Sequence, residues 1–188
     1  MTDDTPPPAQ GSPFWRFSLR FYRMPGVAEA CIELQDRAGM DVNLLLFLLW
    51  NATESRRLSP AEVADLDRMV GEWRKAAVIP LREIRRALKS PPAVVERGTA
   101  EAFRTRIKQV ELEAERLQQE ATYALGQSLR FGAPAASPVE AARDNIAAYQ
   151  ANCPQAFPPA AIHTIMSAFA KMDSATLNKL RLGQGERR

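Results

Sequence analysis

Length, composition and charge place this chain among globular proteins. It has 188 residues, of which 46% are hydrophobic and 25% are charged, and this mixture excludes a chain that is disordered over most of its length. The formal net charge is only +3, which does not by itself indicate a nucleic-acid partner.

Both ends of the chain are expected to lie outside the fold. Residues 1–12 hold two aspartates and a run of three prolines, and they lack the basic stretch followed by an apolar stretch that a signal peptide has. They predict a disordered tail, and residues 183–188 predict a frayed one. Between them we expect a single helical domain over residues 13–182, with one half at 13–90 and the other at 99–182.

Three helices are predicted in the first 52 residues. Ser12 followed by Pro13 is a typical helix start, and this helix extends to about Tyr22. A second helix starts at Pro25 and ends at Gly39, because glycine favours the left-handed conformation of helix ends. The 4-3-4 spacing of apolar residues marks the buried side of this second helix, with Val27, Cys31, Leu34 and Ala38.

The third predicted helix covers Val42–Ala52 and is apolar on nearly every side. A helix of this kind lies at the centre of a fold, surrounded by other helices. Asp41 is placed to cap its first turn. The apolar run of residues 44–50 is far shorter than the roughly 20 residues that a membrane-spanning helix needs. We therefore expect no membrane partner and a cytoplasmic location.

The next predicted helix starts at Ser59 and continues to about Lys89. Ser59 and Glu62 form the pattern of a capping box, with Pro60 in the first helical position. Pro80 lies within this stretch and is expected to break or kink the helix, because proline has no backbone N–H to donate.

A long helix over residues 99–129 carries apolar and small residues at alternating spacings of four and three. This heptad pattern is typical of a helix that packs along another helix. The favoured interpretation is that it packs back on the N-terminal half of the chain, and the alternative is that it pairs with a second copy as a coiled-coil homo-oligomer. We call this set of residues the heptad seam: Phe103, Ile107, Val110, Ala114, Leu117, Ala121, Ala124 and Ser128.

The rest of the sequence predicts two further helices and a short C-terminal segment. Ser137 and Glu140 repeat the capping pattern, Pro158 precedes another helix, and a short segment around Leu177 and Leu180 ends the fold. The predicted fold class is all-α: a bundle of about seven or eight helices with a central hydrophobic helix and one long helix of heptad character.

Three segments of the first half resemble a known family when they are taken together. They are residues 15–27, residues 31–50 with the stretch LQDRAGMDVNLLLFLLW, and residues 73–89. This combination resembles an uncharacterised proteobacterial family of small helical proteins, a domain-of-unknown-function family. The resemblance implies a bacterial, cytoplasmic, helical protein, and it brings no catalytic residues with it.

Two stripes of basic side chains are the strongest lead to a function. Each lies on one face of a predicted helix, and the planar guanidinium group suits phosphate and carboxylate groups. If both stripes lie on the same side of the molecule, they predict a patch for an anionic protein or RNA surface; otherwise they are solvated faces with local ion pairs. The first stripe is Arg16, Arg20 and Arg23, and the second is Arg82, Arg85, Arg86 and Lys89.

A polar group beside the central helix is a second candidate site. Burial of such side chains costs free energy unless they are hydrogen-bonded. The favoured interpretation is structural, with Asp41 as the helix cap. The alternative is a polar pocket for a small molecule or a substrate, formed by Asp36, Asp41, Asn43, Trp50 and Trp73.

Little else in the sequence points to catalysis. His163 is the single histidine, and together with the separated Cys31 and Cys153 it cannot form a zinc site. We expect no cofactor, no metal and no catalytic residue, and we expect Cys31 to be a buried free thiol. The expected function is that of a non-enzymatic binding or adaptor protein that uses its basic helix faces. A small-molecule-binding protein or enzyme, and a coiled-coil homo-oligomer, are the alternatives.

Overall fold

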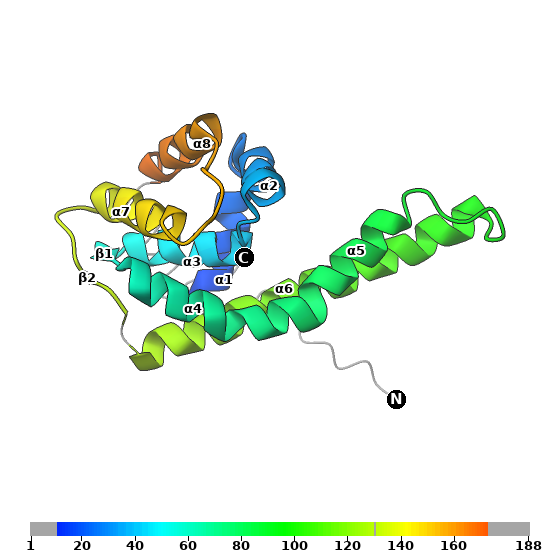
Figure 1. The fold of residues 1–188 in the computed structure, drawn as a ribbon, viewed down its shortest axis with the longest axis horizontal. Helices are drawn as coiled ribbons and strands as arrows, with labels where there is room; N and C mark the ends of the chain where they lie inside the picture. Colours follow the sequence, from blue (N-terminus) through cyan, green and yellow to red (C-terminus); the bar gives the residue numbers. More distant parts are fainter. Residues whose placement is uncertain (1–10, 130, 173–188) are drawn as a thin grey trace, which may run out of the picture.

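The structure is a computed structural model that describes residues 11–129 and 131–172, and over these residues the fold is all-α (Figure 1). The predicted tails, apart from Gly11 and Ser12, and the segment around Leu177 and Leu180 lie outside the described residues. The helices are α1 (Pro13–Tyr22), α2 (Val27–Ala38), α3 (Val42–Ala52), α4 (Pro60–Trp73), the π-helical turn η2 (Arg74–Val78), α5 (Ile79–Ala87), α6 (Arg97–Leu129), α7 (Pro138–Gln150) and α8 (Pro159–Ala170), and the two short strands are β1 (Arg56–Arg57) and β2 (Ala133–Pro134).

The predicted central helix is confirmed as α3. Each of its residues from Leu44 to Trp50 is at most 6% exposed. Helices α1, α2, α6 and α7 all pack against α3, and Figure 1 shows it in the middle of the globular part of the molecule. An all-apolar helix is stable only when other elements cover every side of it, and this arrangement meets that requirement.

The helix boundaries follow the predicted capping signals. Ser12 Oγ accepts a hydrogen bond from the Trp15 N–H at 3.1 Å, and Ser59 and Glu62 form the complete capping box of α4. Gly39 ends α2 with φ of +66°, which is the left-handed conformation expected of it. Cys31 on the inner side of α2 is fully buried, and burial raises the pKa of its thiol to about 12.

Pro80 is accompanied by a local π-helical turn, and the helical segment continues through it. Helices α4 and α5 are joined through η2, a π-helical turn that directly precedes the first turn of α5. The proline ring clashes with the carbonyl group four residues earlier and offers no N–H, and a wider turn removes both conflicts. As a result α4, η2 and α5 form one long helical segment that runs alongside α6.

The long segment gives the molecule a projection that we call the arm, made of α5 and residues 97–114 of α6. Figure 1 shows the arm extending away from the globular part, which we call the body. Beyond the arm, α6 runs along the body in contact with α1, α3 and α4. The arm is thus a two-helix extension whose second helix is anchored in the core.

Asn145 ties α7 to the rest of the body and was not singled out from the sequence. It is fully buried, and its Oδ1 accepts a hydrogen bond from the Leu58 N–H at 2.6 Å. Its Nδ2 donates to the carbonyl groups of Leu48 at 2.9 Å and Arg56 at 3.0 Å. One amide side chain therefore satisfies three backbone groups around the end of α3 and strand β1.

Candidate functional site

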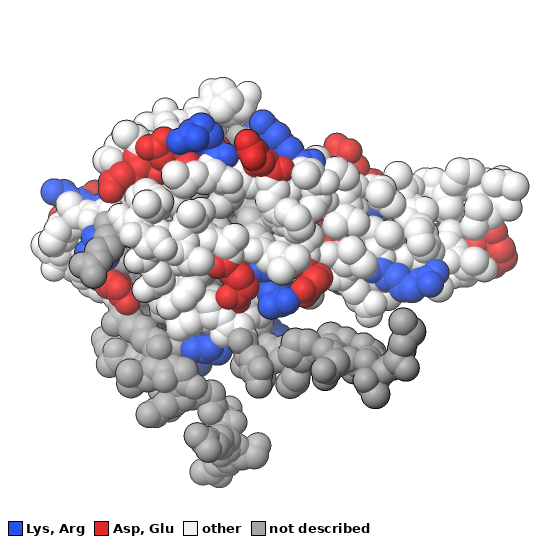
Figure 2. Space-filling view, turned by 90° about the horizontal axis from the view of Figure 1, so that it is seen from below, with Lys and Arg blue, Asp and Glu red and all other residues white. Residues whose placement is uncertain are grey.

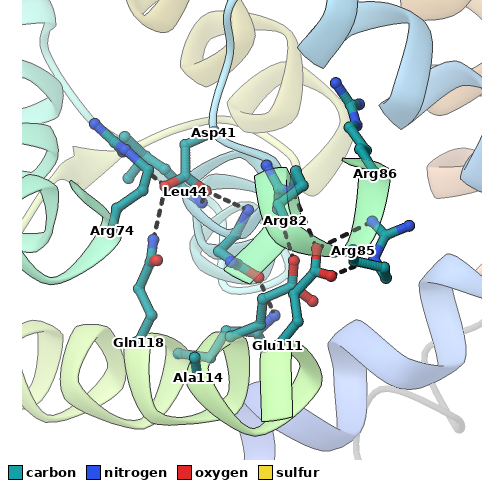
Figure 3. A network of polar contacts seen from close by, with 12 residues as sticks. Asp41, Leu44, Arg74, Arg82, Arg85, Arg86, Glu111, Ala114 and Gln118 are labelled. Atoms are coloured by element: carbon teal, nitrogen blue, oxygen red, sulfur yellow. Dashed lines mark hydrogen bonds and ion pairs between the residues drawn. The ribbon is translucent and has the colours of Figure 1, made fainter. Parts of the chain in front are cut away.

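A polar network surrounds the first turn of α3, next to the base of the arm (Figure 3). Asp41 caps α3 as predicted, because its Oδ1 accepts from the backbone N–H groups of Asn43 at 2.7 Å and Leu44 at 3.2 Å. The other oxygen of the same carboxylate accepts from Arg74 at 2.6 Å and from Gln118 at 2.7 Å. One buried carboxylate thus joins α3, η2 and α6.

Arg74 is the shared counter-ion of two carboxylates in this network. Arg74 binds both Asp41 and Asp67, with the second contact at 2.7 Å. Burial alone would lower the pKa of Arg74, but the two carboxylates outweigh it and raise the pKa above its ordinary value. Tyr149 accepts a hydrogen bond from the Asp41 N–H at 2.8 Å, and burial raises the pKa of its hydroxyl group. The carboxylate, the guanidinium group and the hydroxyl group of this network are thus bound to groups of the same chain.

The second arginine stripe meets carboxylates of α6 at the base of the arm. Arg82 binds Glu111 at 3.2 Å and Glu115 at 2.8 Å, and Arg85 also binds Glu111. The Glu111 side chain is 7% exposed, so these ion pairs are largely shielded from water. The pKa of Glu111 lies below its ordinary value. Burial alone would raise this pKa, but the hydrogen bonds and charges of Arg85 and Arg82 outweigh the effect of burial. Burial raises the pKa of Glu115, and Arg82 only partly opposes this.

The other basic side chains lie in different surroundings. Arg86 forms an ion pair with Asp36 of α2 at 2.8 Å, with both groups about half exposed, and Lys89 is exposed. In the first stripe Arg16 donates to the Gly11 carbonyl group at 2.6 Å, whereas Arg20 and Arg23 are exposed. Arg82 and Arg85 point toward Glu111 of α6, so this part of the second stripe is not an open basic face (Figure 3).

The residues of the predicted polar pocket lie in different surroundings. Asp41 and Asn43 are buried in the network, and Trp50 packs against Phe17 with ring centroids 5.6 Å apart. Asp36 is exposed on α2, and Trp73 of α4 packs against α6, with its indole N–H donating to the Ala114 carbonyl group at 2.9 Å. A surface hollow of about 500 Å³ occurs instead against α7 and α8, and it is lined by Arg143, Ile146, Ala147, Gln150, Phe157, Pro159, Ile162, His163 and Met166.

The heptad seam lies mostly in solvent. Phe103, Val110 and Leu117 are 43%, 52% and 43% exposed, and Ala121, Ala124 and Ser128 are exposed as well. Within the seam only Ala114 is buried, and Ile107 is half-buried. The favoured expectation that this seam packs on the N-terminal half of the chain is therefore wrong for most of its length. Figure 2 shows one face of the arm with few charged side chains.

The face that α6 presents to its own chain is polar. Gln118 donates to Asp41, and Gln119 donates to Asn43 at 2.7 Å. These side chains lie on a second stripe of α6 whose buried members are Glu111, Gln118, Gln119 and Thr122. The signal in the sequence was the spacing of Glu111, Glu115, Gln118 and Thr122, which repeats four and three just as the seam does. A polar stripe next to an apolar one left the choice of the inward face open.

Two kinds of site are not found among residues 11–129 and 131–172. No three His, Cys, Asp or Glu side chains there are grouped so that they could hold a metal ion. No helix in this part of the chain has both the length and the apolar character that a bilayer crossing requires.

The family model described as protein of unknown function (DUF2390) matches residues 13–122 of the chain. The chain belongs to this family. The match extends beyond the three segments that suggested it and reaches through most of α6. It contains the carboxylates and arginines at the base of the arm, whereas Asn145 and Tyr149 lie outside it. No curated protein and no solved structure matches the chain.

Proposed function

We propose that this DUF2390 protein is a non-enzymatic adaptor that binds a helical segment of a protein through the heptad seam. The observation that carries the proposal is that α6 turns its polar side toward its own chain and its apolar side toward solvent. Its polar stripe is buried against its own chain, while Phe103, Val110 and Leu117 are 43–52% exposed at heptad spacing. Exposed apolar side chains in a continuous stripe are typical of interaction surfaces, and the heptad spacing suits a helix as the partner.

Side chains of α4 extend the apolar surface beside the seam. Trp73 is 42% exposed, and its hydrogen bond to the carbonyl group of the seam residue Ala114 holds the indole ring at the edge of the seam. Met69, one helical turn before Trp73, is 40% exposed. Tryptophan and methionine are enriched where proteins bind one another, because they offer large, adaptable contact areas. A partner helix on the seam would contact both.

The other two hypotheses have less support. An anionic protein or RNA on the arginine stripes remains a prediction, but a phosphate group at Arg82 or Arg85 would have to displace Glu111. A small-molecule site at the predicted pocket would need space between side chains that bind one another instead. The proposed adaptor acts in the cytoplasm, since Cys31 and Cys153 are free thiols, which suits a reducing compartment.

A site-specific photo-crosslinking experiment in cells tests the proposal. A photoreactive amino acid is placed at Val110, and in the control variant at Leu112, which is 51% exposed compared with 52% for Val110 but lies about 200° around α6. We expect a defined covalent product from Val110 that the Leu112 position does not give. Equal labelling from both positions, or no product from Val110, would contradict the proposal.

A further inference from the structure

We propose that the helix bound by the seam is α6 of a second copy of this chain, antiparallel to the first, with Val110 of both copies on the two-fold axis. This inference rests on the proposed function, because it names the partner of the same surface. Most soluble oligomers contain identical subunits, and a two-fold interface requires a surface that is complementary to itself. The seam meets this requirement in its apolar residues and in its charges.

The apolar residues are symmetric about Val110. Phe103 precedes Val110 by seven residues and Leu117 follows it by seven, so all three lie on one face of α6. In an antiparallel pair Val110 lies opposite the partner's Val110, and Phe103 lies opposite the partner's Leu117. Each large side chain that is 43–52% exposed in the single chain then has an apolar side chain across from it.

The charges beside the seam favour the antiparallel orientation. Arg106 and Glu113 flank Val110 on the same side of α6, four residues before it and three residues after it. Both are exposed, with Arg106 over the ring of Phe103 and Glu113 in an exposed pair with Arg116. An antiparallel pair brings Arg106 close to the partner's Glu113, and the symmetric contact occurs on the other side of the axis. In a parallel pair Arg106 of one copy and Glu113 of the other would lie on opposite flanks of the interface, so this contact would not form.

The shape of the molecule fits this orientation. Val110 lies in the arm, which extends away from the body (Figure 1), so two antiparallel arms place the two bodies at opposite ends. The segment from Phe103 to Leu117 is about 21 Å long at 1.5 Å per residue. An interface of this length is short, and we expect a dimer that dissociates on dilution rather than an obligate one.

The first test is sedimentation of the purified full chain over a range of about 5 to 500 µM, chosen because short interfaces are weak. The wild type should shift from monomer to dimer as its concentration rises. Val110→Glu and Val110→Lys should each remain monomeric, since they place two like charges on the axis, and Leu112→Glu should dimerise like the wild type. Circular dichroism establishes that each variant is folded. A monomeric wild type at every concentration overturns the inference, and so does a Val110→Glu variant that still dimerises.

Mixing the two charged variants separates loss of the interface from damage to the arm. Equal amounts of Val110→Glu and Val110→Lys should recover the dimer, because opposite charges now meet at the axis. If the mixture stays monomeric while the wild type dimerises, Val110 does not lie opposite the partner's Val110, and the inference fails.

Disulfide trapping fixes the orientation in a Cys153→Ser background. In an antiparallel pair, Phe103→Cys mixed with Leu117→Cys should give a linked heterodimer on mild oxidation, and Phe103→Cys alone should stay unlinked. Linkage of Phe103→Cys to itself would indicate a parallel pair and overturn the proposed arrangement.

The outcomes distinguish this inference from the proposed function. If the purified chain is monomeric but Val110 in cells crosslinks to a protein of another mass, the seam is a docking surface and the second copy is the wrong partner. If Val110 gives no product in cells and the chain is monomeric, both the proposed function and the inference fail.

Discussion

Gly126 of α6 lies directly against the ring of Phe47, the residue at the middle of α3. A Cβ atom on Gly126 would be 2.6 Å from Cζ of Phe47, which is closer than side-chain contacts allow. Phe47 is only 2% exposed and also meets Phe14 edge-on, with ring centroids 5.3 Å apart. The close approach of α6 to the central helix therefore requires a residue without a side chain, glycine, at position 126.

Replacement of Gly126 by alanine should destabilise the protein, although alanine is the better helix former. The added methyl group forces the ring or the helix to move, at a cost of about 1–3 kcal/mol, which exceeds the gain of about 1 kcal/mol from helix propensity. Gly71→Ala in α4 is the matched control, since its Cβ would approach the Arg74 side chain at an ordinary 3.4 Å. Thermal unfolding should show a lower Tm for Gly126→Ala and an unchanged or higher Tm for Gly71→Ala. Equal shifts would contradict the packing argument.

Asn145→Ala should be among the most destabilising single substitutions in the body. It leaves the Leu58 N–H and the carbonyl groups of Leu48 and Arg56 without the side chain that binds them. A buried polar group that loses its partner costs about 1–3 kcal/mol, so we expect a total loss of roughly 3 kcal/mol or more in the free energy of unfolding. The control is Asn152→Ala in the exposed turn after α7, with an expected loss below about 1 kcal/mol. Urea denaturation of both variants measures the difference.

Glu111→Gln should loosen α5 from α6 within the arm. The substitution removes the charge that binds Arg82 and Arg85 in a site where the carboxylate is 7% exposed, and we expect a loss of about 2 kcal/mol. Glu113→Gln is the control, because Glu113 forms an exposed pair with Arg116 whose removal should cost less than about 0.5 kcal/mol. Hydrogen exchange should show faster exchange in α5 for the Glu111 variant only. A uniform increase in both variants would speak against a local anchor.

The helices and their ends could be predicted from local signals. Val42–Ala52 is the observed range of α3, and the caps at Ser12, Asp41 and Ser59 occur as expected. These features depend on residues within a few positions of one another, so a pattern in the sequence is enough to identify them.

The inward face of α6 could not be predicted in the same way. Its choice depends on contacts such as the one between Asp41 and Gln118, which are 77 positions apart. Periodicity shows that an apolar stripe exists, but it does not show whether the same chain covers that stripe. For the same reason the partners of Arg82 and Arg85 were not identified, although Glu111 and Glu115 have the matching charge and helical spacing.

The two carboxylates at the base of the arm should give opposite dependences of stability on pH. The pKa of Glu111 is lower in the folded protein than its ordinary 4.5, so its contribution is present above pH 4.5 and is lost as the pH falls through the folded pKa. The pKa of Glu115 is higher in the folded protein than 4.5, so the folded state takes up that proton first, and stability rises as the pH falls toward 4.5. Urea denaturation of the wild type, Glu111→Gln and Glu115→Gln between about pH 7 and pH 3.5 separates the two effects. The stability deficit of Glu111→Gln should shrink at the acidic end. The stability of Glu115→Gln relative to the wild type should be lowest at and below about pH 4.5. If the difference in unfolding free energy from the wild type changed with pH in the same way for both variants, the opposite pKa shifts of the two side chains would be contradicted.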